Sequence, residues 1–279
     1  MNTKEIIDII KSNNIFPNKK LGQNFICNNS IVRRIIEFSG VKKKDDILEI
    51  GPGLGDLTEL LLEQANSVTS VEIDSGLYQF LKNRFAASAN LNLIHGDFLK
   101  LKINGNFTKV ISNLPYYCSS EILFRLVSIF HVEEIFVMLQ KEMAERIKAS
   151  PGTKNYGALS VTLGLYYNSE ILFKIDKKSF YPQPDVSSSF ICLKRKKDTL
   201  LNGKETELFH LIVKSAFWGR RKTLKKSLMD SPHFNFNREA LLEALSENLT
   251  DINIRGEELT IKEFINITKT YSGYDREKH

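Results

Sequence analysis

Three glycines at alternate positions have a spacing that is typical of a ligand-binding loop. Gly51, Gly53 and Gly55 lie directly after an apolar run and before an amphipathic one. Small residues between a strand and a helix let the backbone approach a ligand, and the helix start adds N–H donors. Asp56 stands where a dinucleotide fingerprint has its third glycine, and a carboxylate there would repel a pyrophosphate. The loop therefore favours a zwitterionic or cationic ligand.

Two acidic residues at the ends of later apolar runs suit a nucleoside. Glu72 comes 19 residues after Gly53, where an acidic side chain can accept hydrogen bonds from both hydroxyls of a ribose. Asp97 follows the next run, LNLIHG, and its carboxylate could accept a hydrogen bond from an exocyclic amino group such as that of adenine. Ribose and adenine without a diphosphate indicate S-adenosylmethionine as the ligand.

The tetrapeptide Asn113-Leu114-Pro115-Tyr116 follows a further strand-like run and predicts methyl transfer to a base. The lone pair of an exocyclic base amine is delocalised into the ring, so acceptors that hold its N–H groups favour a nucleophilic, tetrahedral nitrogen. The Asn113 side-chain oxygen and the Leu114 carbonyl can be those acceptors, while Tyr116 offers a flat surface for stacking. The alternative is an ordinary turn with a core aromatic, and the position at a strand end favours the site.

The elements that must position these residues follow from the spacing of apolar residues. From about residue 47, short apolar runs alternate with longer amphipathic ones, which predicts βαβ units and a doubly wound α/β sheet. The expected strands are 47–50, 67–73, 91–96, 108–113, 133–140 and 187–196, and the expected helices are 56–64, 75–85 and 119–130. We expect a Rossmann-like catalytic domain over residues 1–197.

Beyond that domain the apolar spacing is helical only, which predicts a small helical domain over residues 198–279. Its start is basic, because residues 194–226 hold eleven Lys or Arg and only three Asp or Glu. Such a stretch suits a polyanion, although a solvated basic face would look the same. The residues expected to bind RNA here are Arg220, Arg221, Lys222 and Lys225.

Composition indicates a globular protein, since apolar residues make up 42% and charged residues 26% of the 279 residues. Cys27, Cys118 and Cys192 are far apart and lack any C-x-x-C spacing, so neither a disulfide framework nor a metal site is expected. No apolar run approaches the roughly 18 residues that span a bilayer. We therefore expect a cytoplasmic protein outside the membrane, and nothing in the sequence demands more than a monomer.

Several segments together resemble one family, the ribosomal RNA adenine N6,N6-dimethyltransferases of the KsgA/RsmA type. The resemblance covers nearly the whole chain and rests, besides the tetrapeptide, on LGQNFICN (21–28), ILEIGPGLGDLT (47–58), FYPQPDVSSS (180–189) and FWGRRKTLKKSL (217–228). It implies that Asn24 and the backbone of Ile26 help to bind S-adenosylmethionine. The full set of expected cofactor-binding residues is Asn24, Ile26, Gly51, Gly53, Glu72, Asp97 and Asn113.

The resemblance also implies the substrate and a second stacking residue. Asn113, Leu114 and Tyr116 would face the target adenine, with Phe180 on its other side, because a flipped base needs two flat walls. The alternative for Phe180 is an aromatic packed in the core. The family dimethylates two adjacent adenosines in the 3′-terminal hairpin loop of 16S rRNA, within the small (30S) subunit, which implies a role in subunit biogenesis. Asp185 departs from the Lys that is common in the family.

Three other functions compete with this one. The resistance methyltransferases of large-subunit rRNA share the tetrapeptide but usually lack Pro52 and have a shorter C-terminal domain. A ribosome assembly factor with little catalysis would not need Glu72, Asp97 and Asn113 together. A nicotinamide-dependent dehydrogenase is disfavoured by Asp56 and leaves the tetrapeptide unexplained.

Overall fold

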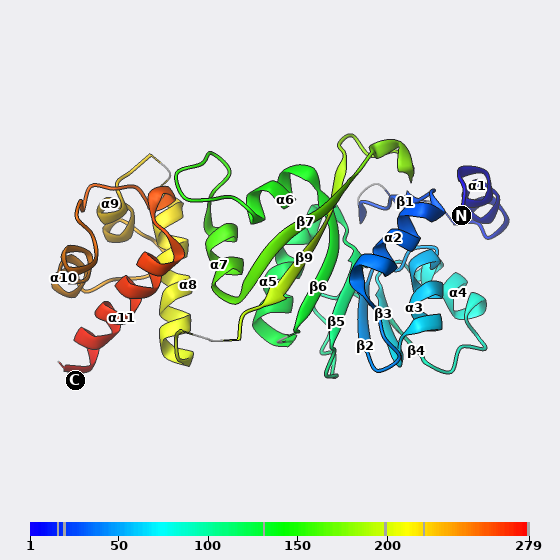
Figure 1. Cartoon of the computed structure of the whole chain (residues 1–279), viewed down its shortest axis with the longest axis horizontal. Coiled ribbons are helices and arrows are strands. Elements are labelled where there is room, and N and C mark those ends of the chain that lie inside the picture. The colour runs from blue at the N-terminus through cyan, green and yellow to red at the C-terminus, as the bar shows by residue number, and fades with distance from the viewer. Residues whose placement is uncertain (16, 19–20, 131, 198–199, 220, 278–279) are drawn as a thin grey trace. The chain divides into compact units, whose positions relative to one another are not determined.

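The computed structural model describes residues 1–15, 17–18, 21–130, 132–197, 200–219 and 221–277 (Figure 1). The chain divides into two compact units. The first comprises Met1–Ala144 and Ser169–Arg195, and the second comprises Glu145–Asn168 and Lys196–His279.

The first unit is built on a mixed sheet whose strands lie in the order β4-β3-β2-β5-β6-β9-β7. Neighbouring strands from β4 to β6 are parallel, whereas β9 runs antiparallel to β6. The strands are β2 (Asp46–Ile50), β3 (Ser67–Glu72), β4 (Leu91–His95), β5 (Lys109–Asn113), β6 (Glu134–Gln140), β7 (Tyr167–Ile175) and β9 (Ser188–Arg195). The predicted doubly wound α/β fold is thereby confirmed. The strand predicted over 187–196 is β9, which runs antiparallel to its neighbour β6.

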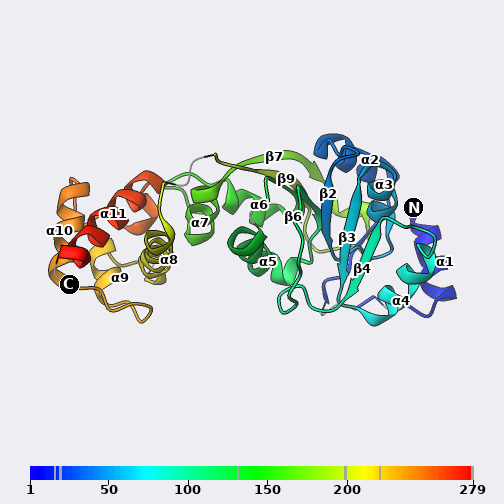
Figure 2. The same cartoon turned by 90° about the horizontal axis from the view of Figure 1, so that it is seen from below.

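Helices fill the connections between these strands. Those in the connections are α3 (Asp56–Gln64), α4 (Ser75–Arg84) and α5 (Ser119–Arg125), which continues as a π-helical turn over Leu126–Phe130. Two further helices, α1 (Thr3–Ser12) and α2 (Asn29–Ser39), precede β2 in the chain. Figure 2 shows α3 beside β3 and α4 beside β4. Leu61 of α3 is fully buried with Ile47, Val68 and Ile111 of the sheet. Burial of each such side chain contributes about 1.5–3 kcal/mol, which fixes the helix on the sheet.

The order of the strands places a switch point beside β2. The chain leaves β2 for β3 and β4 on one side, and then returns to pair β5 with the other side of β2, with Leu48 opposite Val110. Ligands of open α/β sheets bind at such reversals, outside the carboxyl ends of the strands. Gly51 follows β2, Glu72 ends β3 and Asn113 ends β5, so all three meet at this point.

A short two-stranded ribbon joins two distant segments near the same edge. β1 (Phe25–Ile26) pairs antiparallel with β8 (Phe180–Tyr181), so that Phe25 lies opposite Tyr181 and Ile26 opposite Phe180. The Cys27 N–H also donates to the Ser179 carbonyl at 2.8 Å. The ribbon holds the segment after residue 21 against the sheet.

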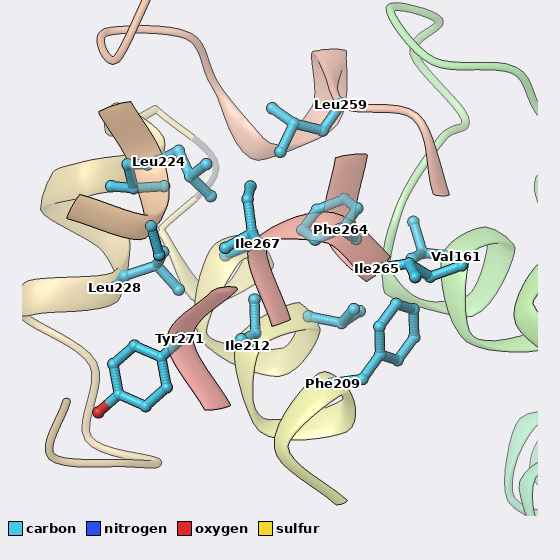
Figure 3. Packing of buried hydrophobic residues seen from close by; sticks show 14 of the residues in the cluster. Val161, Phe209, Ile212, Leu224, Leu228, Leu259, Phe264, Ile265, Ile267 and Tyr271 are labelled. Atoms are coloured by element: carbon cyan, nitrogen blue, oxygen red, sulfur yellow. The ribbon is translucent and has the colours of Figure 1, made fainter. Parts of the chain in front are cut away.

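The second unit is helical and has its own hydrophobic core (Figure 3). After α6 (Lys141–Ile147), which crosses from the first unit, its helices are α7 (Ala158–Tyr166), α8 (Gly203–Trp218), α9 (Leu224–Met229), α10 (Arg238–Asn248) and α11 (Ile261–Glu277). Figure 3 shows Phe209 and Ile212 of α8 packed with Phe264 and Ile267 of α11. Buried aromatic contacts such as Phe209 with Phe264, whose ring centroids are 6.4 Å apart, fix the helices against one another.

The predicted division at 197/198 differs from the observed one in one segment. Glu145–Asn168 belongs to the second unit, although the sequence pattern assigned it to the catalytic domain. The reason is packing, because Tyr156, Val161 and Leu165 lie in the core of the helical unit. The Tyr156 hydroxyl also donates to the Leu259 carbonyl at 2.8 Å.

Within the described ranges, no helix combines the length and the apolar character that a membrane span requires.

Candidate functional site

A cavity lies at the switch point, where β2, β3 and β5 end. It is lined by the glycine loop, by the segment that leads into β1, and by the turn after β5. Its lining residues are Leu21, Gly22, Gln23, Asn24, Phe25, Ile26, Glu49, Gly51, Pro52, Gly53, Leu54, Asp56, Leu57, Glu72, Ile73, Leu77, Asn113, Leu114, Pro115, Tyr116 and Tyr117. The structure therefore brings together Asn24, Ile26, Gly51, Gly53, Glu72, Asn113, Leu114 and Tyr116 of the predicted site.

The glycine loop has a backbone that other residues rarely adopt. Gly51 and Gly53 have φ values of +70° and +61°, in the left-handed region where a Cβ is strained. A Cβ on Gly53 would also come within 3.2 Å of the Phe25 ring. The two glycines thus keep the cavity open and expose backbone to a ligand.

Glu72 is the buried acidic group of the cavity. Its side chain is only 3% exposed, and it accepts hydrogen bonds from the backbone N–H of Gly53 (3.3 Å) and of Asp74 (2.9 Å). Burial raises the pKa of Glu72 to about 7, although the two backbone donors act in the opposite direction. A buried carboxylate on a cavity wall fits the paired hydroxyl donors of a ribose.

Glu49 is a second buried carboxyl at the cavity, and the sequence analysis did not single it out. It accepts hydrogen bonds from the hydroxyls of Thr58 (2.8 Å) and Ser70 (2.7 Å), and burial raises its pKa to about 7. An acidic residue inside the otherwise apolar run ILEI was the available signal, because an acidic residue is almost never fully buried without partners.

The turn after β5 presents two unengaged acceptors. Asn113 Nδ2 donates to the Asn24 carbonyl at 3.1 Å, which fixes the plane of the side-chain amide. The Leu114 N–H donates to the Met138 carbonyl at 3.2 Å, which ties the turn to β6. No described residue donates a hydrogen bond to Asn113 Oδ1 or to the Leu114 carbonyl, so both remain available to a ligand that carries an amino group.

Two tyrosines complete the wall beside these acceptors. The Tyr116 hydroxyl forms a hydrogen bond with the buried Ser188 hydroxyl of β9, and burial raises the pKa of the Tyr116 phenol. Tyr117 also lines the cavity and is 54% exposed. Tyr116 is therefore a neutral ring that its hydroxyl anchors to β9, as a stacking surface requires.

Two predicted residues do not line the cavity. Asp97 accepts a hydrogen bond from the Leu99 N–H at 2.9 Å and pairs with Lys100 at 3.4 Å. Burial raises the pKa of Tyr117, and the charge of Asp97 contributes in the same direction. Phe180 is 3% exposed and packs in the core with Ile26. That placement agrees with the alternative of a core aromatic, and the roles of both residues stay predictions.

The predicted RNA-binding residues lie in the second unit. Arg221 is exposed, whereas Lys222 and Lys225 are half-buried, and Lys222 Nζ pairs with Asp230 at 2.9 Å. Arg220 lies outside the described residues. In the part of the chain that the structure describes, no group of three or more His, Cys, Asp or Glu could hold a metal ion.

The cavity fits S-adenosylmethionine by its charge as well as its shape. Three acidic residues line it, namely Glu49, Asp56 and Glu72, and no Lys or Arg does so among the described residues. Of the three, Asp56 is paired with the Met1 ammonium at 3.3 Å and with Arg84 at 3.8 Å. Acidic surroundings suit a cationic sulfonium and ammonium, whereas they would repel a diphosphate. Gly51 and Gly53 leave the room that side chains would fill.

Comparison with known proteins gives a consistent result along the chain. The family described as "Ribosomal RNA adenine dimethylase" matches residues 15–272. The chain is 36% identical to the Ribosomal RNA small subunit methyltransferase A of Listeria welshimeri, over 97% of this chain and 96% of the relative. It is 40% identical to the protein of the same name from Clostridium botulinum, over 95% of this chain and 96% of the relative.

Two solved structures are similar over most of the chain. A dimethyladenosine transferase from Plasmodium falciparum superposes with a TM-score of 0.76 at 27% identity, covering 87% of this chain and 95% of that one. The 23S rRNA methyltransferase ErmE gives a TM-score of 0.68 at 25% identity, covering 89% of this chain and all of that one.

Proposed function

Because this chain belongs to the ribosomal RNA adenine dimethylase family, we propose that it dimethylates N6 of two adjacent adenosines in the 3′-terminal hairpin loop of 16S rRNA. The chain is an enzyme of the S-adenosylmethionine-dependent class. One observation carries the proposal, namely that a buried carboxylate for the cofactor and two unengaged acceptors for an amino group line the same cavity.

When bound, S-adenosylmethionine supplies an electrophilic methyl group, and the residues of this chain supply position and polarity. Glu72 would accept hydrogen bonds from the ribose hydroxyls, and Gly51 and Gly53 would allow the backbone to approach. The acidic residues of the cavity favour a positively charged ligand over the neutral product that remains after transfer. Binding and orientation of this kind account for a large part of a transfer rate.

Asn113 and Leu114 act on the adenine. Their oxygens accept hydrogen bonds from the N6 amino group, which holds the nitrogen lone pair out of conjugation with the ring and makes the nitrogen nucleophilic. Tyr116 stacks on the base and keeps it in the cavity. Once methylated, the positively charged nitrogen would lose a proton to solvent, so no general base is needed.

The small subunit is favoured over the large one as substrate. The relatives that are 36% and 40% identical are small-subunit methyltransferases by name, whereas ErmE, named for 23S rRNA, is 25% identical. We propose further that the enzyme acts on rRNA within the 30S particle, that it contributes to subunit biogenesis, and that it is located in the cytoplasm. The protein would act there as a monomer, without a metal ion.

Transfer of labelled methyl groups tests this function. Purified enzyme is incubated with unmethylated small subunits and, in parallel, with large-subunit RNA, and the product nucleosides are separated. We expect N6,N6-dimethyladenosine in the small-subunit 3′ hairpin and no label in large-subunit RNA. Label in large-subunit RNA alone would show that the substrate is large-subunit rRNA. Absence of label from both RNAs would overturn the proposed methyltransferase function.

A further inference from the structure

Trp218, at the end of α8, is a large aromatic side chain that the packing of the second unit leaves outside. It is 48% exposed, whereas Phe209, Ile212 and Ala216 of the same helix are buried in the core. It is also the single tryptophan of the chain. An exposed indole lacks the stabilisation that burial would give. Its face is available instead for contact with a ligand.

Neighbouring side chains hold the indole in a defined orientation. The His233 ring meets it edge-on, with ring centroids 6.3 Å apart and an interplanar angle of 85°. Lys222 Nζ lies 5.6 Å from the indole centroid and is itself held by Asp230 at 2.9 Å. A cation beside an aromatic face stabilises both groups. Trp218 is thus a preorganised surface, and little side-chain entropy is lost when a ligand binds it.

The sequence on either side of Trp218 is positively charged. No acidic residue occurs between Glu207 and Asp230 in the sequence, whereas six Lys or Arg do. Of the described ones, Lys214, Arg221 and Lys226 are exposed. An aromatic platform among cations is the arrangement with which proteins bind single-stranded nucleic acid, because bases stack on the ring while the cations meet the phosphates.

We propose that Trp218 stacks on an unpaired base of the RNA, with the exposed Arg221 and Lys226 contacting the adjoining phosphates. This inference rests on the proposed function, since it takes RNA as the ligand, but it assigns a second base-binding position that is separate from the adenine cavity. Unpaired rather than duplex RNA is expected, because bases within a duplex already stack on their neighbours and do not offer a free face.

The single tryptophan makes the test direct. Its fluorescence is recorded while the wild-type protein is titrated with a single-stranded adenylate dodecamer and, separately, with an RNA duplex of the same length. We expect the single strand to quench the emission by at least half and to reduce quenching by acrylamide severalfold. We expect the duplex to leave the emission nearly unchanged at equal occupancy, as measured by anisotropy of labelled RNA.

Variants then separate stacking from general packing. Trp218→Ala is expected to weaken binding of the single strand by about fivefold or more, and Trp218→Phe, which keeps a flat ring, is expected to restore most of it. Leu200→Ala is the matched control, because Leu200 is 55% exposed in the same unit and carries no ring. Circular dichroism confirms that each variant is folded.

The outcomes distinguish this inference from the proposed function. Bound single strand with unchanged tryptophan emission, or Trp218→Ala binding as tightly as Leu200→Ala, would overturn stacking at Trp218 even if the wild-type enzyme dimethylates small subunits. Failure of the wild-type enzyme to form dimethyladenosine would overturn the proposed function, whatever the fluorescence shows.

Discussion

Glu72 shows how burial of one residue tunes the affinity of the cavity for its cofactor. Its pKa is raised to about 7, from an ordinary value of 4.5, chiefly because the carboxyl is buried. Ribose hydroxyls donate best to the ionised form, so binding of the cofactor favours loss of the proton. A group that titrates near neutral pH therefore makes cofactor binding depend on pH.

We predict that S-adenosylmethionine binds more tightly at pH 8 than at pH 6, by about tenfold, because one pH unit below the pKa leaves about a tenth of the carboxyl ionised. Calorimetric titration at both pH values measures this, and titration near pH 7 should show proton release. Glu72→Gln should bind more weakly and with a flatter pH dependence, and the dependence that remains would belong to Glu49, whose pKa is also about 7. A wild-type dissociation constant that is equal at both pH values would contradict this role for Glu72.

At the residue scale, most of the cavity was predictable from the sequence. The spacing of Gly51, Glu72 and Asn113 relative to the strand ends was informative, because a parallel sheet brings its carboxyl ends to one edge. Glu49 was missed because it lies inside a strand, where its neighbours are apolar. The burial of Phe180 depends on a partner strand more than 150 residues away, which no local pattern reveals.

Among the elements, the glycine loop between β2 and α3 is the one on which cofactor binding depends most. Gly53→Ala should lower cofactor affinity by at least about tenfold, since the new Cβ meets the Phe25 ring at 3.2 Å and strains a φ of +61°. It should also lower the free energy of unfolding by about 1–2 kcal/mol, the usual cost of the left-handed region. Calorimetric titration and chemical denaturation measure the two effects.

Gly40→Ala is the matched control for that substitution. Gly40 ends α2 with a φ of +53°, and nothing lies within 4 Å of the position that a Cβ would take. We expect a similar decrease in stability with cofactor affinity unchanged. An equal decrease of affinity in the two variants would show that backbone strain, and not the close approach at Gly53, determines binding.

Local periodicity predicted helices α3, α4 and α5 and strands β2, β3, β4, β5, β6 and β9, because each repeats one pattern over several residues. It missed β1 and β8, which have two residues each and exist only through pairing with each other. It also missed α1, although a signal was present: Asn2 and Glu5 form a capping box around its first turn. Helix α2 and strand β7 were missed as well, and β7 lies at the edge of the sheet, where its burial pattern is irregular.

For the whole molecule, the first unit holds the cofactor cavity and the second holds the predicted RNA-binding residues, which leads to a prediction about RNA binding. Arg221→Glu, Lys222→Glu and Lys225→Glu combined should weaken binding of small-subunit rRNA by tenfold or more at low salt. The slope of log affinity against log salt should become shallower by about 0.7–0.9 for each phosphate that the protein no longer neutralises. Binding measured over a salt series tests this.

The same change of charge in the first unit is the control. Lys42, Lys43 and Lys44 are exposed and consecutive, so their combined replacement by Glu alters net charge equally. We expect a smaller effect on both affinity and salt slope. If the two triple variants bind RNA with the same reduced affinity, overall charge and not the basic segment of the second unit governs RNA binding.

The boundary between the units was only partly accessible to sequence reasoning. The change to purely helical spacing after residue 198 is local, and the pattern revealed it. Glu145–Asn168 belongs to the helical unit because of long-range contacts. One of them is the hydrogen bond from the Tyr156 hydroxyl to the Leu259 carbonyl, which joins residues 103 positions apart. No spacing within that segment indicates where its apolar face will pack.

The central claim is that the acceptors at the turn after β5 activate the amino group of the target base. The rate of the first methyl transfer, measured in a single turnover with saturating cofactor and unmethylated small subunits, tests it most directly in Asn113→Ala. We predict a rate at least about a hundredfold lower, with the dissociation constant of S-adenosylmethionine changed by only a few fold. A variant that transfers methyl groups as fast as the wild-type enzyme would contradict this activating role.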